Sequence, residues 1–329
     1  MNRFITSLLA LGLSAAVIPA EAKELRLSAA PPAGSPWGKV TQQFVDKVAE
    51  LSGGELTINA FMGSKLGGEQ DVVKQIARGR VDMGVMSNTA VSLLVPEFGL
   101  LAAPYAFDSA EQFDCVADEH LLDTFGEEFD AAGIKTLSWM EVGYQVIFSQ
   151  DPIKVPGDLS GVKIRTAPSA TDTKFIQAAG GTAVPLSPAD TIPALKTSQV
   201  DAATQLSVFG IVVGYPEVAG NITLTRHQHQ VGGIIMSKRS WEGLSETEQG
   251  WITEAAPIFL GLRQALRGAE GALLGKAASG GATVHELNAA EMAAWKAIVP
   301  TAMDTILDEM GAAAKAKWQL ITAAKAACS

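Results

Sequence analysis

The strongest constraint on the fold is an alternation of strand-like and helix-like segments over residues 24–87. Apolar and polar residues alternate at 24–29 and again at 55–61, as they do in half-buried strands. Between these segments, apolar residues recur at helical spacing from Trp37 to Leu51, and a second amphipathic helix is expected around Val72. A short apolar strand follows at 80–87. This order predicts a largely parallel sheet with helices on its faces.

The same alternation continues through the middle of the chain. We expect strands at 134–140, 144–149, 161–166, 182–186, 199–206 and 230–237, and helices near 171–179 and 190–199. The start of the second helix stays open between Ser187 and Asp190 as N-cap, because Pro193 falls in the tolerated first turn only with Asp190.

From Trp241 onward the chain is predicted to be mostly helical. Ser245 and Glu248 form a capping-box pair that opens a helix expected to continue past residue 270. A further strand is expected at 283–287, before an Ala-rich helical end capped by Asn288 and Glu291.

Residues 1–22 have the features of a secretory signal peptide. Arg3 precedes a short apolar run at 4–18, and Ala20-Glu21-Ala22 has the small-x-small form that precedes cleavage. The apolar run is too short, and too soon broken by Pro19, for a membrane span. We therefore expect an exported, soluble mature chain beginning at about Lys23.

Charge and cysteine content narrow the function further. The 329-residue chain is 47% hydrophobic and carries a net charge of −10, with no basic run, which argues against nucleic-acid binding. Its length suits two domains or one large α/β unit. Export permits a disulfide, but the sequence leaves open whether its two cysteines, Cys115 and Cys328, pair.

Motifs for catalysis are absent from the sequence. It contains no G-x-S-x-G elbow, no Walker A loop, no G-x-G-x-x-G after a strand and no H-E-x-x-H. His227 and His229 could form a two-ligand metal fragment, but no third ligand lies nearby in sequence, so we expect no metal and no cofactor. Glu69 is interpreted as a helix-start residue. An exported α/β chain of this kind is expected to bind rather than to catalyse.

Several segments, in order, resemble the DctP-type extracytoplasmic solute-binding proteins of TRAP transporters. The resemblance extends over roughly residues 24–300. The similar segments are SGGELTINAFMGSKLGGEQDVVKQIARGRVDMGVM (52–86), VPEFGLLAAPYAF (95–107), PIKVPGDLSGVKIRT (152–166), PLSPADTIPALKTSQVDAATQL (185–206), LTRHQH (224–229) and SKRSWEGLSETEQGWI (237–252). Any one of them alone would be a weak signal.

This resemblance implies a two-domain periplasmic-binding-protein fold of type II-like α/β architecture, with crossing hinge strands and a long interdomain helix. One domain would comprise 23–142 and about 231–270, and the other 143–230 and about 271–329. The domains would close over a ligand. The family also implies a periplasmic monomer that delivers its ligand to the membrane subunits of a TRAP permease.

The family's signature arginine falls on Arg165, where it would hold the ligand carboxylate in a two-pronged salt bridge. Many members have a second arginine where this chain has Gln145, and an asparagine where it has Gln205. Acid-sugar binders have a glutamate at the position of Ser87. Among nearby aromatic residues we expect Phe209 to line the pocket, and Trp37 is a further candidate; Tyr105, Trp139 and Tyr144 also lie near these loops.

With one cation and two amides, the site is expected to suit a hydroxy or keto monocarboxylate rather than a dicarboxylate. A sulfonate would also suit Arg165. The alternative is a sensory protein that presents a bound organic acid or sulfonate to a membrane receptor, and an exported enzyme is a third possibility.

Overall fold

The computed structural model describes residues 23–328, apart from the side chains of residues 122 and 123, so the predicted signal peptide lies outside the described residues. The described strands form one nine-stranded sheet with the order β2-β1-β3-β8-β4-β7-β5-β6, and β9 pairs with β8. They are β1 (Lys23–Ala29), β2 (Leu56–Met62), β3 (Met83–Ser87), β4 (Ile134–Ser149), β5 (Lys163–Thr166), β6 (Thr182–Pro185), β7 (Ala202–Leu206), β8 (Asn221–Ser237) and β9 (Thr283–His285).

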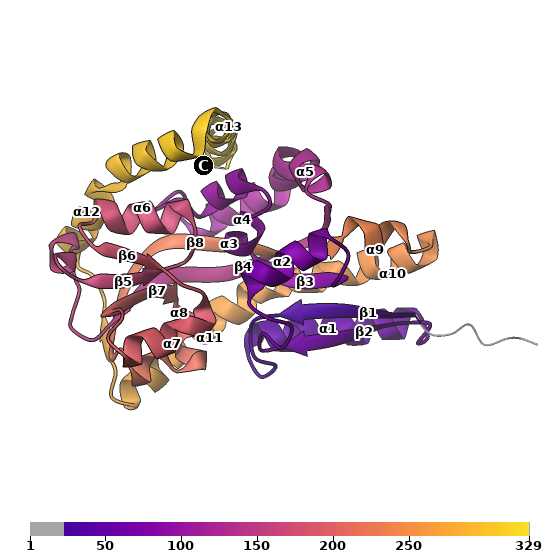
Figure 1. Cartoon of the computed structure of the whole chain (residues 1–329), viewed down its shortest axis with the longest axis horizontal. Coiled ribbons are helices and arrows are strands. Elements are labelled where there is room, and N and C mark those ends of the chain that lie inside the picture. Colours follow the sequence, from indigo (N-terminus) through magenta and orange to yellow (C-terminus); the bar gives the residue numbers. More distant parts are fainter. Residues whose placement is uncertain (1–22, 329) are drawn as a thin grey trace, which may run out of the picture.

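Helices cover both faces of this sheet (Figure 1). The α-helices are α1 (Pro36–Leu51), α2 (Glu69–Ala77), α3 (Asn88–Val91), α4 (Ala110–Glu119), α5 (Leu121–Ala131), α6 (Ala170–Ala178), α7 (Pro188–Lys196), α8 (Ser207–Val213), α9 (Lys238–Glu242), α10 (Glu246–Ala255), α11 (Leu262–Ser279), α12 (Ala289–Ala297) and α13 (Val299–Ala327). The 3-10 turns are η1 (Pro96–Ala102), η2 (Pro156–Leu159), η3 (Tyr215–Glu217) and η4 (Ala256–Gly261). Over residues 23–328, none of the helices has both the length and the apolar character needed to span a bilayer.

Two long strands join the halves of the sheet. Strands β1–β3 are parallel where they pair, as are β5–β7, and the antiparallel strands β4 and β8 run between these two sets. We refer to the part built around β1–β3 as lobe I and to the part built around β5–β7 as lobe II. The predicted α/β fold with crossing strands is confirmed, whereas the predicted domain boundaries stay a prediction.

The two separate strands expected at 134–140 and 144–149 are one continuous strand, β4. Its pairing with β8 shifts register between Glu141 and Gly143. Gly143 has φ of 113°, a conformation that other residues rarely adopt, so glycine lets the strand pass through this irregularity without ending. The sequence shows the local break, but the ladder on either side of it keeps the strand whole.

The structure settles the start of one helix that the sequence left open, and it shows a break in another helix that was expected to be continuous. Ser187 is the N-cap of α7, since its Oγ accepts a hydrogen bond from the backbone N–H of Asp190, and Pro193 therefore lies inside the helix. The helix expected from 246 past 270 is interrupted by η4, which has Pro257 at its start. Proline has no N–H to continue an α-helical ladder, which accounts for the break.

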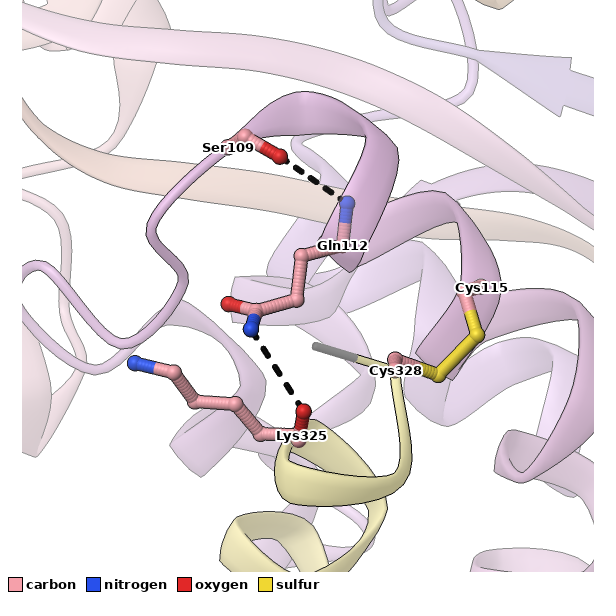
Figure 2. Close-up of a disulfide and its surroundings, with 5 residues drawn as sticks. All are labelled: Ser109, Gln112, Cys115, Lys325 and Cys328. Atoms are coloured by element: carbon pink, nitrogen blue, oxygen red, sulfur yellow. Dashed lines mark hydrogen bonds between the residues drawn. A yellow bond between two sulfur atoms is a disulfide. The ribbon is translucent and has the colours of Figure 1, made fainter.

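The C-terminal helix α13 packs against α6 of lobe II and against η1 and α4 of lobe I (Figure 1). It contains a kink at Gly311, where φ is 85°. Its end is attached to α4 by a disulfide between Cys115 and Cys328, 213 residues apart (Figure 2). The pairing that the sequence left open is therefore present. Beside it, Lys325 forms an ion pair with Asp108 at 3.1 Å.

Candidate ligand-binding site

A cavity lies between the lobes where β1, β3, β5 and β7 reach their carboxyl ends. Open α/β sheets bind ligands at this edge, where the strand order reverses. Lobe I, lobe II and the crossing strands all contribute to its wall. The lining residues are Ala30, Pro31, Trp37, Glu69, Gln70, Val85, Ser87, Thr89, Met140, Val142, Gln145, Arg165, Ala167, Pro188, Leu206, Phe209 and Gln230. Five of the six candidate residues from the sequence are among them.

Arg165 lies in the wall of this cavity and is only 2% exposed. Its Nε donates to the carbonyl of Leu186 at 2.9 Å and its Nη1 to the carbonyl of Thr204 at 2.7 Å. Among the described residues, Nη2 has no hydrogen-bond partner. Two bonds thus fix the plane of the guanidinium and leave donor capacity for an anion.

The electrostatic setting of Arg165 depends on burial and on neighbouring groups. Burial lowers the pKa of its guanidinium, whereas Tyr215 and Asp172 raise it. Arginine remains protonated in proteins, so this environment holds a full positive charge with little solvent around it. A carboxylate that enters the cavity meets that charge at low dielectric, where ion pairs and charge-assisted hydrogen bonds are strong.

Asp172 supports this part of the site from behind. Its carboxylate is fully buried, and Oδ2 accepts hydrogen bonds from the backbone N–H of Ala167 at 2.6 Å and from Oγ1 of Thr204 at 2.7 Å. These contacts connect α6 with the segment that follows Arg165 and with β7. Its Oδ1 lies 3.9 Å from Nε2 of His227 on β8. Asp172 therefore helps to hold the strand ends that frame Arg165.

The two predicted glutamines occupy different places. Gln145 lines the cavity at 2% exposure, and its Oε1 has no hydrogen-bond partner within residues 23–328. Gln205 does not line the cavity: its Nε2 donates to the hydroxyl of Tyr215 at 3.1 Å and its Oε1 accepts from the backbone N–H of Leu206. Gln230, which sequence reasoning did not select, lines the cavity instead.

Strand register accounts for the opposite directions of the Gln145 and Gln205 side chains. Gln145 on β4 pairs with Leu206 on β7, so the two side chains lie on one face of the sheet and both line the cavity. Gln205, one residue earlier on β7, therefore points to the opposite face. The register between β4 and β7 is not encoded in the local pattern of either strand, so the sequence alone could not have shown which of the two glutamines lines the cavity.

The aromatic part of the wall consists of Trp37 and Phe209. Their rings are 6.3 Å apart in an edge-to-face arrangement, and Trp37 is only 1% exposed. The indole Nε1 of Trp37 has no hydrogen-bond partner in the described part of the chain. A buried donor of this kind in a cavity wall is suited to a ligand oxygen. Tyr105, Trp139 and Tyr144, the other aromatic candidates, are not among the lining residues.

Ser87 lines the cavity at the end of β3 and is joined there by Glu69, the first residue of α2. The carboxylate of Glu69 accepts hydrogen bonds from the backbone N–H of Ser87 at 2.6 Å and from its Oγ at 2.8 Å. Burial raises the pKa of Glu69, although these two bonds act to lower it. The sequence analysis interpreted Glu69 as a helix-start residue, and this is correct. The start of α2 also lies at the cavity, so Glu69 is a lining residue as well.

His227 and His229 are buried in separate aromatic surroundings. His227 stacks on Phe175, with ring centroids 5.1 Å apart, and His229 stacks on Tyr144 at 4.3 Å. Within residues 23–328 there is no group of three or more histidine, cysteine, aspartate or glutamate residues placed to hold a metal ion. The two histidines thus contribute to packing beside the crossing strands.

The combination of a two-lobed α/β fold, crossing strands and a buried arginine in an interlobe cavity is typical of binding-protein architecture. The chain belongs to the DctP family of bacterial extracellular solute-binding proteins, family 7, whose model matches residues 27–311. The resemblance seen in the sequence is therefore confirmed, and the protein is an extracellular solute-binding protein of the DctP type.

Known proteins of this kind are similar to the chain over most of its length. The 2,3-diketo-L-gulonate-binding periplasmic protein YiaO of Escherichia coli is 27% identical over 216 residues, which span 65% of this chain and 66% of that protein. A solute-binding protein of Chromohalobacter salexigens is 27% identical over 226 residues, spanning 68% of this chain and 67% of that protein.

Solved structures confirm the fold. The sugar acid binding protein DctPAm of Advenella mimigardefordensis, in complex with galactonate, has a TM-score of 0.89 at 23% identity and covers 94% of this chain and 99% of its own. A TRAP periplasmic solute binding protein of Sulfitobacter with bound β-D-galacturonate has a TM-score of 0.86 at 24% identity, covering 91% and 99%.

Proposed function

We propose that this protein captures a small organic monocarboxylate in the interlobe cavity and delivers it to a TRAP-type membrane permease. The observation that carries the proposal is the buried guanidinium of Arg165, held by two backbone carbonyls and lining the cavity. Planar guanidinium groups match the geometry of a carboxylate, which favours an acid group as the anchor.

The charge of the wall favours one carboxylate rather than two. In the described part of the chain, Arg165 is the only lysine or arginine that lines the cavity, and Glu69 is the only acidic residue that does so. A second carboxylate on the ligand would lie close to Glu69 without a cation to offset the repulsion. A hydroxyl group could instead donate to Glu69 or to the free Oε1 of Gln145. The ligand is thus a hydroxy or keto monocarboxylate.

The known ligands of similar proteins are compatible with this choice. YiaO binds 2,3-diketo-L-gulonate, and DctPAm binds galactonate. Both compounds carry one carboxylate with hydroxyl or keto groups beside it. The C4-dicarboxylate-binding periplasmic protein DctP of Rhodobacter capsulatus is also similar, at 23% identity over 296 residues, so the similarity supports an organic acid and the wall of the cavity carries the choice of a monocarboxylate.

A thermal-shift comparison of matched acids and amides tests the proposal. The mature protein would be heated with 2-hydroxy and 2-keto monocarboxylates, with their primary amides and with succinate. A ligand at 100 times its dissociation constant stabilises a protein by about 2.7 kcal/mol, enough for a shift of several degrees. We expect shifts from monocarboxylates and none from the amides. Equal shifts from an acid and its amide would contradict the proposed role of Arg165. A larger shift from succinate than from the monocarboxylates would contradict the proposed preference for a single carboxylate.

A further inference from the structure

A second chamber adjoins the cavity that contains Arg165. It lies between the same two lobes and shares four lining residues with the first: Ala30, Glu69, Pro188 and Phe209. We call the cavity lined by Arg165 the inner chamber and this second one the outer chamber. The inner chamber has a volume of about 60 Å³ and the outer one about 260 Å³. The two are therefore consecutive parts of one interlobe cleft.

The inner chamber alone is small for a ligand site. A single buried water needs a cavity volume of roughly 10–15 Å³. The volume of the inner chamber, about 60 Å³, therefore suits a carboxylate and the few atoms next to it. Pockets for small molecules typically measure about 300–1,000 Å³, and only the two chambers together reach the lower end of that range. An acid anchored at Arg165 thus has most of its available space in the outer chamber.

The wall of the outer chamber is mainly apolar. Lobe I contributes Pro32, and lobe II contributes Ile192, Val213 and the ring of Phe209. Within residues 23–328, neither lysine nor arginine lines it, and Glu69, at the junction with the inner chamber, is its only charged lining residue. Two hydroxyls also lie in this wall: that of Ser187 already donates to Asp190 at 2.6 Å, and that of Ser64 has no hydrogen-bond partner among the described residues.

This arrangement disfavours charged groups in the outer chamber and offers few partners for hydroxyl groups. Apolar surface gains free energy when it leaves water, whereas a polar group that loses water needs a replacement hydrogen bond. The part of the ligand that reaches past Phe209 therefore has a different chemistry from the part beside Arg165. One end of the ligand is an acid and the other end is apolar.

We propose that the ligand is an amphipathic monocarboxylic acid whose apolar extension, of about four or more carbon atoms, occupies the outer chamber. The inference rests on the proposed function, since it takes the carboxylate to be bound at Arg165. It adds a length and a polarity to the ligand, and it distinguishes this site from one for a compact, fully hydroxylated sugar acid.

Calorimetric titration with 2-hydroxybutyrate, 2-hydroxyoctanoate and D-galacturonate tests the inference. The first two acids share a head group and differ by four methylenes. Burial of each methylene is worth about 0.8 kcal/mol, or about fourfold in affinity. We expect 2-hydroxyoctanoate to bind tens to hundreds of times more tightly than 2-hydroxybutyrate, and D-galacturonate to bind less tightly than 2-hydroxyoctanoate.

A matched pair of substitutions locates the extension. Ile192 and Ile211 are both half-buried isoleucines of lobe II, but only Ile192 lines the outer chamber, while Ile211 lines a groove elsewhere. Ile192→Ser should weaken the binding of 2-hydroxyoctanoate by roughly tenfold and leave the affinity for 2-hydroxybutyrate nearly unchanged. Ile211→Ser should leave both affinities unchanged. Each variant would first be checked for cooperative unfolding.

The outcomes separate the two proposals. Equal affinity for the short and the long acid, with binding still lost in Arg165→Ala, would overturn the apolar extension and leave the proposed function intact. Tighter binding of D-galacturonate than of 2-hydroxyoctanoate would do the same. If no monocarboxylate binds, or if Arg165→Ala binds the acids as tightly as the wild type, the proposed function is wrong and this inference is wrong with it.

Discussion

Replacement of Trp37 by phenylalanine tests the polar complement of the site. Trp37 is 1% exposed and lines the inner chamber, and its Nε1–H has no partner among the described residues. We infer that a ligand oxygen accepts a hydrogen bond from it. The Trp37→Phe variant keeps an aromatic ring beside Phe209 but removes the donor.

The magnitude follows from one hydrogen bond. A neutral hydrogen bond contributes about 0.5–1.5 kcal/mol net, so its loss should weaken binding by about two- to twelvefold. The free energy of unfolding of the unliganded protein should change little, because two effects oppose each other. The smaller ring packs less well, but an unpaired buried donor, which costs about 1–3 kcal/mol, is removed.

Calorimetry with 2-hydroxybutyrate and butyrate measures the effect. If Nε1 donates to the hydroxyl, Trp37→Phe weakens 2-hydroxybutyrate by about two- to twelvefold more than butyrate. An equal loss for both acids would show that Trp37 provides shape and not a hydrogen bond to the hydroxyl. Unchanged affinity for both acids would refute the inferred contact altogether. Urea unfolding of both proteins serves as the control for stability.

Three further predictions follow from the same structure. Cys115→Ser combined with Cys328→Ser should lower the free energy of unfolding by about 2–4 kcal/mol, since the disulfide constrains an unfolded loop across 213 residues; urea titration measures this, and equal stability would contradict it. Burial raises the pKa of Glu69 above its ordinary value of 4.5. The protonated carboxyl therefore contributes its full share to the free energy of unfolding below pH 4.5, and this share is lost as the pH rises through the raised pKa. Glu69→Gln should therefore lose less stability than the wild type between pH 4.5 and pH 8 in urea unfolding, and parallel pH profiles would contradict the assignment. Gln145→Leu should weaken acid binding about tenfold or less, whereas Gln205→Leu should alter stability and leave affinity unchanged, and calorimetry that finds the reverse order would contradict the placement of the two glutamines.

The sequence predicts most of the elements because their signals are local. The apolar spacing from Trp37 to Leu51 gives α1, and the capping box at Ser245 and Glu248 marks the start of α10. The signal at Gly143 is also local, but it led to the wrong prediction of two strands in place of β4. A glycine with positive φ can lie within a strand as well as between two strands. The cross-strand pairing that keeps β4 whole involves residues about ninety positions away.

The site could be predicted in part. Arg165 was found because it stands at a strand end within a recognisable segment. Gln205 was chosen from its position in a similar segment, yet the register of β7 turns it toward Tyr215. Glu69 has two roles, as the first residue of α2 and as a cavity residue, and only the first leaves a sequence signal. Side-chain direction at strand and helix ends depends on tertiary packing, which the local pattern does not contain.

The most direct test of the account is the dissociation constant of a bound monocarboxylate in Arg165→Ala compared with Arg239→Ala. Arg239 is an exposed arginine that does not line either chamber, so its loss changes the net charge equally. Arg165→Lys serves as a second variant that keeps a buried charge, and near-ultraviolet circular dichroism checks that each variant is folded. Loss of a desolvated charge pair costs about 2–5 kcal/mol, so affinity should fall by at least roughly thirtyfold in Arg165→Ala and stay unchanged in Arg239→Ala. A folded Arg165→Ala protein that binds the acid as tightly as the wild type would contradict the central claim.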